Sequence, residues 1–78
     1  MIVLNQIRSN LQNAIKQSGL QQKEISEKIG ISQATISQYM SGRAMPALDT
    51  FARLCVALDL DANEILQITS ENKHIHKK

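Results

Sequence analysis

The sequence predicts an all-α fold, a compact domain of five helices. Apolar residues recur at helical spacing along the chain, and no segment shows the alternation that is typical of a β-strand. The three glycines, Gly19, Gly30 and Gly42, each follow such a segment, where a helix commonly ends in the left-handed conformation. The 78 residues suit one domain, and an aromatic content of only 3% indicates a core of helical aliphatic side chains.

The first helix is predicted from an apolar stripe near the start of the chain. Its members are Leu4, Ile7, Leu11 and Ile15. Gly19 ends the helix, and Leu20 is placed to make the apolar contact that accompanies a left-handed helix end.

The second helix is predicted over about residues 22–29. Ile25 and Ile29 face inward, Gly30 ends the helix, and Ile31 fills the corner that follows.

The third helix is predicted to start after Ser32, whose hydroxyl suits the N-cap position. It continues to about Met40 and ends at Gly42.

Two further helices are predicted after Met45 and Pro46. The fourth helix carries Leu48, Phe51, Leu54 and Leu58 on one face. Asp61 and Glu64 resemble a capping box at the start of a short fifth helix, which carries Ile65, Leu66 and Ile68.

The domain is expected to span residues 1–69, followed by a polar tail, 70–78, that we expect to be disordered. The tail holds His74 and His76, but structural zinc normally takes four ligands, so no metal site is expected. No cofactor is expected either.

Several classes of protein do not fit the composition. The single Cys55 forms no internal disulfide, which favours a cytoplasmic location, and its apolar surroundings predict a buried, inert thiol. No apolar run reaches the ~20 residues that span a bilayer. No catalytic constellation and no glycine-rich phosphate loop can be placed on the helices, so the chain is not expected to be an enzyme.

Charge is distributed unevenly along the chain. Residues 1–46 carry five basic and two acidic side chains, whereas residues 47–78 carry four basic and five acidic ones. The positive charge therefore accompanies the second and third helices, as attraction to phosphate would require, although a solvated surface can show the same bias.

The third helix has an outward face of small polar side chains. On a helical wheel, Ile36 and Tyr39 share the buried side. The opposite arc holds Gln33, Ala34, Ser37, Gln38 and Ser41. A glutamine amide can pair with two adenine edge atoms at once, and an alanine methyl fits against the methyl of thymine. Each residue alone would be ordinary solvated surface, but the two-helix pattern favours base reading by Gln33, Ala34, Ser37 and Gln38.

The segment QKEISEKIGISQATISQYMS resembles the helix-turn-helix of the lambda-repressor-like family, of the Cro/CI or XRE type. The likeness covers roughly Leu4 to Ile68 and implies a helix-turn-helix on helices two and three. It assigns base reading to Gln33, Ala34 and Gln38. Phosphate contacts are expected, from the resemblance and from position, at Gln22, Lys23, Ser32, Thr35, Ser41 and Arg43.

Four residues depart from the family pattern. Gln21 and Ala47 stand where a capping Ser or Thr is usual, and each loss is expected to cost about 1 kcal/mol. Ser26 replaces the usual alanine at the contact between the two motif helices and is equally small. Asp59 replaces a frequent glycine, and Asp tolerates the left-handed conformation.

Apolar residues toward the end of the chain suggest a contact between two copies of the protein. Val56, Leu60, Ile65 and Ile68 either complete the core or form a two-fold dimer interface. Such a dimer would set two recognition helices about 34 Å apart over successive major grooves.

The sequence therefore predicts a transcriptional regulator, a repressor that binds a pseudo-palindromic operator in double-stranded DNA as a homodimer. The alternative is a protein-interaction module, such as the antitoxin of a toxin–antitoxin pair, which would have a protein partner and would usually keep DNA binding. No membrane association is expected. An enzyme is the weakest reading.

Overall fold

A computed structural model describes residues 1–68 of the chain, and these residues form five helices and no β-strand. The predicted polar tail with its two histidines lies outside the described residues. The helices are α1 (Leu4–Gln17), α2 (Gln22–Ile29), α3 (Gln33–Ser41), α4 (Leu48–Leu58) and α5 (Ala62–Ile65). The all-α, five-helix prediction is confirmed. None of these helices is long and apolar enough to cross a lipid bilayer.

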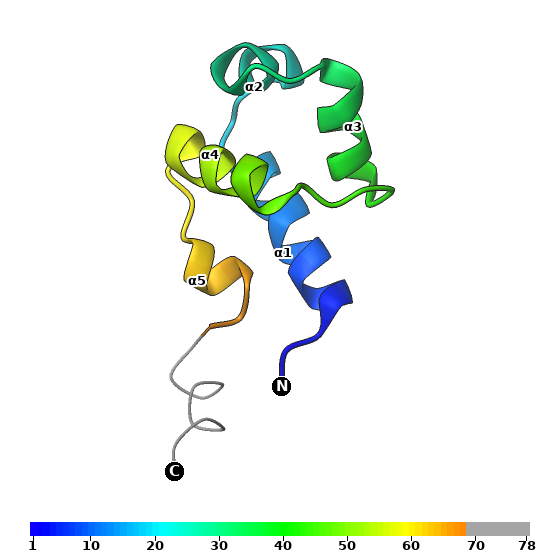
Figure 1. Cartoon of the computed structure of the whole chain (residues 1–78), viewed down its shortest axis with the longest axis vertical. Helices are drawn as coiled ribbons and strands as arrows, with labels where there is room; N and C mark the ends of the chain where they lie inside the picture. Colours follow the sequence, from blue (N-terminus) through cyan, green and yellow to red (C-terminus); the bar gives the residue numbers. More distant parts are fainter. Residues whose placement is uncertain (69–78) are drawn as a thin grey trace.

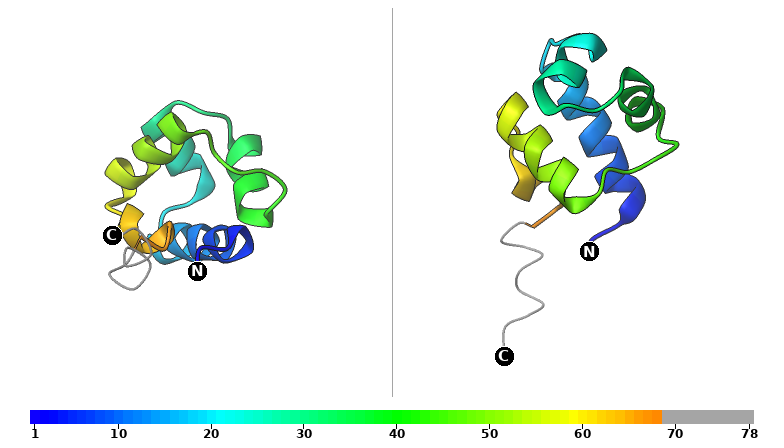
Figure 2. Two further views of the ribbon diagram at one scale, coloured as in Figure 1. Left: turned by 60° about the horizontal axis from the view of Figure 1, so that its bottom comes forward. Right: turned by 45° about the horizontal axis from the view of Figure 1, so that its top comes forward.

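The helices surround a small aliphatic core. In Figure 1, α1 passes behind α4, α2 lies above both, and α3 stands at the outer edge of the molecule. Figure 2 shows the same arrangement from two other directions, with the helices around a common interior. The buried apolar side chains are Leu11, Ile15, Ile25, Ile29, Ile36, Tyr39, Phe51, Leu54 and Ile65. Every helix contributes at least one of them, so the burial of apolar surface stabilises the whole arrangement.

The apolar stripe of α1 is only partly buried. Leu11 and Ile15 lie in the core and Ile7 is half-buried, as the spacing predicted. Leu4 is 58% exposed, because it is the first residue of the helix and the first turn extends past the helices that cover the rest of the stripe.

The predicted apolar face of α4 is correct except at its first residue, Leu48. Phe51 and Leu54 are buried and Leu58 is half-buried, but Leu48 is 83% exposed. At about 100° per residue, Leu48 lies about 120° around the helix from Leu54 and so falls outside the buried arc.

The predicted helix ends are largely confirmed. Gly19, Gly30 and Gly42 all have positive φ and follow helices, and Asp59 adopts the same left-handed conformation with φ of 55°. The Asp61 carboxylate accepts a hydrogen bond from the Glu64 N–H at 3.3 Å at the start of α5. Because α5 ends at Ile65, Leu66 and Ile68 lie beyond the helix that was expected to carry them.

Two expectations about capping differ in outcome. Ala47 offers no side-chain cap to α4, as predicted. At α2, however, the Glu24 carboxylate accepts a hydrogen bond from the backbone N–H of Gln21 at 2.9 Å. The start of α2 is therefore stabilised by its third residue, and the absence of a Ser or Thr at Gln21 does not leave that N–H unpaired.

The short helix α5 is held against α1 by both packing and a hydrogen bond. The Ile65 side chain lies in the core, and the Asn10 amide donates to the Ile65 carbonyl oxygen at 3.1 Å.

The thiol of Cys55 is half-buried on α4, less than its apolar sequence context suggested. Burial raises its pKa, and the nearby Asp61 carboxylate raises it further because two negative charges would repel each other. The thiol is therefore neutral at pH 7, which suits a structural residue.

Candidate DNA-binding interface

Helix α3 has one buried face and one exposed face, as its wheel predicted. Ile36 is fully buried and Tyr39 is nearly so, and both pack in the core. The four predicted base-reading side chains are all exposed: Gln33, Ala34, Ser37 and Gln38. Because α3 stands at the edge of the molecule (Figure 1), no other described helix covers this face.

Hydrogen bonds of Ser26 stabilise the turn between α2 and α3. Gly30 takes the left-handed conformation with φ of 72°, and the N–H groups of Gly30 and Ile31 both donate to the Ser26 carbonyl oxygen, at 2.9 and 3.3 Å. The Ser26 hydroxyl in turn donates to the Ile31 carbonyl. Sequence reasoning assigned Ser26 only a small size. The structure shows that its hydroxyl also links α2 to the turn, which an alanine could not do.

The first turn of α3 presents hydroxyl groups beside its N-terminus. The Ser32 oxygen accepts the Thr35 N–H at 3.1 Å, which confirms Ser32 as the N-cap. The Ser32 and Thr35 hydroxyls also lie 2.9 Å apart and share one hydrogen bond. Two hydroxyls carry two hydrogens, so one donor remains for an outside acceptor such as a phosphate oxygen. The positive end of the helix dipole favours an anion at the same place.

The loop after α3 folds back onto the helix end. The Ser41 hydroxyl and the Arg43 N–H both donate to the Gln38 carbonyl oxygen, at 3.2 and 3.0 Å. The Gln12 amide of α1 donates to the Met40 carbonyl at 3.1 Å and anchors the same end. The Arg43 side chain is exposed, so its guanidinium is held next to α3 by its backbone while facing solvent.

The start of α2 supplies the remaining predicted phosphate contacts. Lys23 is exposed and Gln22 is half-buried, and both lie in the first turn of the helix. Their backbone N–H groups belong to the positive end of α2, where the helix dipole favours an anion.

Arg8 is a basic residue near this interface that sequence reasoning missed. A Cβ atom at Gly42 would lie 3.1 Å from Cδ of Arg8, so the arginine stem packs directly beneath the loop that precedes Arg43. Its Nη1 donates to Asn5 Oδ1 at 2.7 Å, and its Nε is buried without a hydrogen-bond partner among the described residues. Arg8 thus adds positive charge beside the loop. The position of Arg8 beside this loop follows from the packing of α1 against residue 42. No local pattern in the sequence indicates it.

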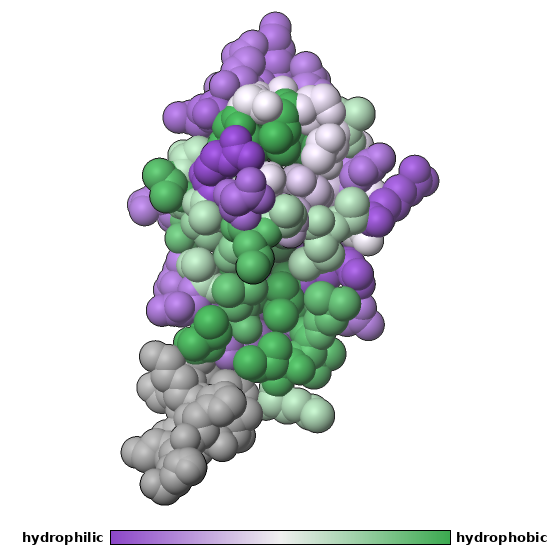
Figure 3. Space-filling view, viewed as in Figure 1, coloured by the Kyte–Doolittle hydropathy of each residue, from purple (hydrophilic) through white to green (hydrophobic). Residues whose placement is uncertain are grey.

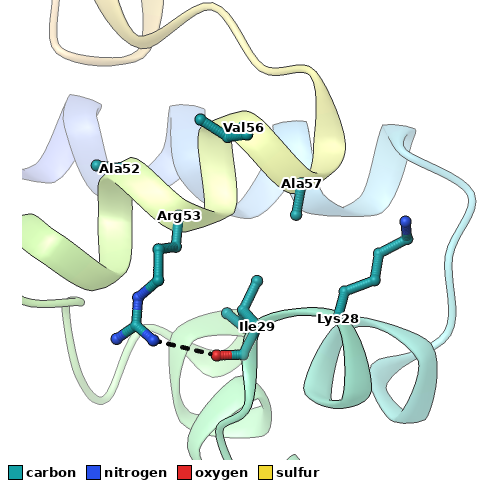
Figure 4. Close-up of a pocket in the computed structure, with 6 residues that line it drawn as sticks. All are labelled: Lys28, Ile29, Ala52, Arg53, Val56 and Ala57. Atoms are coloured by element: carbon teal, nitrogen blue, oxygen red, sulfur yellow. Dashed lines mark hydrogen bonds between the residues drawn. The ribbon is translucent and has the colours of Figure 1, made fainter.

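A groove of about 670 Å³ lies between α2 and α4, apart from the exposed face of α3. In Figure 4, Ile29 and Ala57 point toward each other across this groove, and Arg53 reaches from α4 to α2. The Arg53 guanidinium donates to the Ile29 carbonyl oxygen at 3.3 Å. The partial negative charge at the C-terminal end of α2 stabilises this cation. The hydrogen bond is a second interaction that holds the segment next to the turn.

The four residues predicted to make a dimer contact do not form one surface. Ile65 is only 4% exposed and belongs to the core, so it is not accessible to a partner and the core-completing alternative holds for it. Leu60 is half-buried against the core. Val56 is 84% exposed and lines the α2–α4 groove, whereas Ile68 is 38% exposed and follows α5.

The sequence model of the helix-turn-helix family HTH_3 matches residues 11–65. These residues run from the buried part of α1 to the end of α5 and include both motif helices. The chain therefore belongs to this family of Cro/CI, XRE-type helix-turn-helix proteins, a family of DNA-binding regulators. Comparisons with curated proteins and with solved structures give no significant match.

Proposed function

We propose that the protein is a sequence-specific transcriptional repressor that binds a pseudo-palindromic operator as a dimer, with α3 in the major groove. The observation that carries the proposal is the exposed face of α3. Four small polar or methyl-bearing side chains stand there on a helix whose other side is locked into the core by Ile36 and Tyr39. A rigid helix with such a face matches the geometry by which helix-turn-helix proteins read base edges.

Base reading is proposed for Gln33, Ala34, Ser37 and Gln38. The amides of Gln33 and Gln38 suit the paired donor and acceptor of adenine, while the Ser37 hydroxyl suits either kind of edge atom. The Ala34 methyl suits contact with a thymine methyl.

Phosphate contacts are proposed at both ends of the motif. These contacts fix the register on the duplex and carry no direct sequence information. The residues are Gln22 and Lys23 at the start of α2, Ser32 and Thr35 at the start of α3, and Ser41 and Arg43 after it.

The experiment that tests base reading starts from selection of bound sequences from a random DNA pool. We expect one enriched motif, and Gln33→Ala should lower affinity for it by about 1–3 kcal/mol and relax the preference at one base pair. Gln17→Ala, which removes another exposed glutamine at the end of α1, is the matched control and should leave binding unchanged.

Arg43→Ala should act differently from Gln33→Ala. It should weaken operator and random DNA alike and reduce the dependence of log K on log salt by about 1 for each lost phosphate contact. If Gln33→Ala weakens both kinds of DNA equally, α3 does not read bases through Gln33 and the assignment fails.

Repression is proposed by analogy with the family. A protein that covers an operator overlapping a promoter excludes the polymerase. A reporter gene placed behind the selected operator tests this step, since occlusion requires expression to fall when the protein is present. A cytoplasmic location is proposed from the single Cys55, which has no partner for an internal disulfide.

The second candidate is a protein-interaction module, for example an antitoxin that retains DNA binding. The groove between α2 and α4 favours it, because Val56 and Ala52 give an apolar lining beside the cations of Lys28 and Arg53. Co-purification of a partner that is lost on Val56→Glu, with DNA binding retained, would support this role.

A further inference from the structure

The groove between α2 and α4 combines an apolar lining with two cationic side chains. Ala52 and the 84% exposed Val56 lie one turn apart on α4 and form an exposed apolar stripe. Figure 4 shows the Arg53 and Lys28 side chains on opposite sides of Ile29. Figure 3 shows hydrophobic residues gathered over the lower part of the described molecule, whereas over α2 and α4 they adjoin strongly hydrophilic ones.

The two cations of the groove keep capacity for an outside anion. The Arg53 guanidinium donates to the Ile29 carbonyl oxygen and lies 3.8 Å from the Asp49 carboxylate. A guanidinium carries several N–H donors, so this side chain, which is 53% exposed, keeps donors for a further acceptor. The Lys28 ammonium forms no hydrogen bond or ion pair with any residue in the described part of the chain. Glu24, one turn before it, caps the start of α2 instead.

We propose that this groove binds an acidic amphipathic helix of another protein. Two apolar side chains one turn apart on such a helix would cover the stripe of Ala52 and Val56. Carboxylates beside them would form charge-assisted hydrogen bonds with Lys28 and Arg53. The partner belongs to the second candidate function, the protein-interaction module, on which this proposal rests.

Other occupants fit the groove less well. Two copies that met groove to groove would bring the cations of both copies together, and like-charge repulsion opposes this contact. Residues 69–78 of the chain carry three lysines and one glutamate, so their charge has the same sign as that of the groove. Nucleic acid would neutralise the two cations, but its phosphates would leave the stripe of Ala52 and Val56 without an apolar partner.

A partner in the groove is compatible with the proposed DNA contacts. None of the side chains that line the groove belongs to α3, and none is a proposed base or phosphate contact. The bound helix would therefore leave Gln33 and Gln38 accessible. The protein would then hold its partner and its operator at the same time.

The first test selects binders from a library of helical peptides displayed on a stable scaffold, with the surface of one helix randomised. The unmodified chain is the target, and an excess of the Val56→Ser variant competes for peptides that bind elsewhere. Serine removes the apolar contact without adding a charge, so the competitor does not itself favour acidic peptides. We expect enriched peptides to carry two aliphatic residues one turn apart, with aspartate or glutamate beside them.

The affinity of an enriched peptide then tests the apolar stripe. Val56→Ser should weaken binding about tenfold, because a buried valine contributes roughly that much. Leu48→Ser is the matched control, because Leu48 is equally exposed on α4, at 83%, but does not line the groove. It should leave the peptide affinity unchanged.

A charge exchange tests the role of Lys28. Lys28→Glu should weaken binding of the acidic peptide at least about tenfold, and a peptide with lysine in place of its acidic residue should recover the affinity. A folding defect would not be recovered by a change in the peptide, and thermal unfolding confirms that the variant is folded. Lys16→Glu, which reverses an exposed charge at the end of α1, should leave the affinity unchanged.

Three results would overturn the inference. They are a selection that enriches no peptide, one that enriches peptides without acidic residues, and no recovery of binding after the charge exchange. If Lys28→Glu instead weakens binding to the selected DNA motif and leaves the peptide affinity unchanged, the groove contacts the duplex and nucleic acid is its occupant.

The same measurements separate this inference from the proposed functions. An unmodified chain that binds acidic peptides but enriches no DNA motif would contradict the DNA-reading proposal and leave the groove assignment standing. Peptide binding without any co-purified protein partner would contradict the antitoxin role and leave the chemistry of the groove standing. Retained DNA specificity without peptide enrichment would contradict only the groove assignment.

Discussion

Gly30 and Gly42 both end helices in the left-handed conformation, but they differ in their surroundings. At Gly30, φ is 72° and an added Cβ would have no neighbour within 4 Å. At Gly42, φ is 80° and an added Cβ would lie 3.0 Å from Gln12 Nε2 and 3.1 Å from Arg8 Cδ. Gly30 is therefore required for its backbone alone, whereas Gly42 also permits α1 to pack closely against the loop after α3.

This difference predicts unequal effects of the same substitution. Gly30→Ala should lower the free energy of unfolding by about 1–2 kcal/mol, the cost of the left-handed conformation for a residue with a Cβ. Gly42→Ala should cost roughly 1 kcal/mol more, because it also displaces the Gln12 amide from the Met40 carbonyl. Urea unfolding measures both, and equal midpoints for the two variants would show that α1 does not constrain Gly42.

At the scale of the element, the start of α2 depends on Glu24. Its carboxylate accepts the Gln21 N–H at 2.9 Å and lies at the positive end of the helix dipole. Glu27, three residues later on the same helix, is exposed and makes no side-chain hydrogen bond or ion pair among the described residues. The two glutamates thus have the same chemistry but different positions relative to the helix start.

We predict that Glu24→Ala lowers the free energy of unfolding by about 1 kcal/mol, as the loss of a helix cap does. Glu27→Ala should change it by less than about 0.5 kcal/mol, which is typical of a surface substitution. Glu24→Gln should lie between them, because the amide oxygen can still accept the Gln21 N–H. Thermal unfolding of the three variants side by side provides the measurement, and similar losses for both alanine variants would contradict the capping role.

The helix ends could be predicted from the sequence because their causes are local. The Ser32 hydroxyl, the Asp61 carboxylate and the glycine at 42 each act within a few residues of their own position. The exposed face of α3 follows from the same local periodicity, although the DNA contacts of its side chains stay predictions.

Features that depend on packing between distant segments could not be predicted. The exposure of Leu4, the burial of Ile65 and the position of Arg8 under residue 42 each depend on how α1 lies against other segments. Apolar spacing identifies which residues share a helix face. It does not say where along that face its neighbours end, so it could not separate the buried Ile65 from the exposed Val56 and Ile68.

At the scale of the whole molecule, a two-fold dimer restricts the spacing of its target sites. Two copies of α3 held at a fixed separation can occupy successive major grooves only when the half-sites lie about one helical turn, 10–10.5 base pairs, apart. Inserting about five base pairs between them rotates one half-site to the opposite side of the duplex.

We therefore predict that such an insertion lowers the affinity at least about tenfold, toward that of a single half-site, because the second copy loses its effective concentration. Inserting about ten base pairs returns both half-sites to the same side of the duplex but increases the distance between them, so it should restore binding only in part. A gel-shift titration of the three duplexes measures this, and unchanged affinity after the five-base-pair insertion would mean that the copies bind independently.

The hydrogen bond between the Val3 N–H and Gln67 Oε1 joins the beginning and the end of the described fold. A polypeptide fused before Met1 consequently emerges beside the residues that follow α5. A purification tag placed there would disturb both ends of the fold at once, so unfolding of a tagged and of a cleaved preparation should be compared.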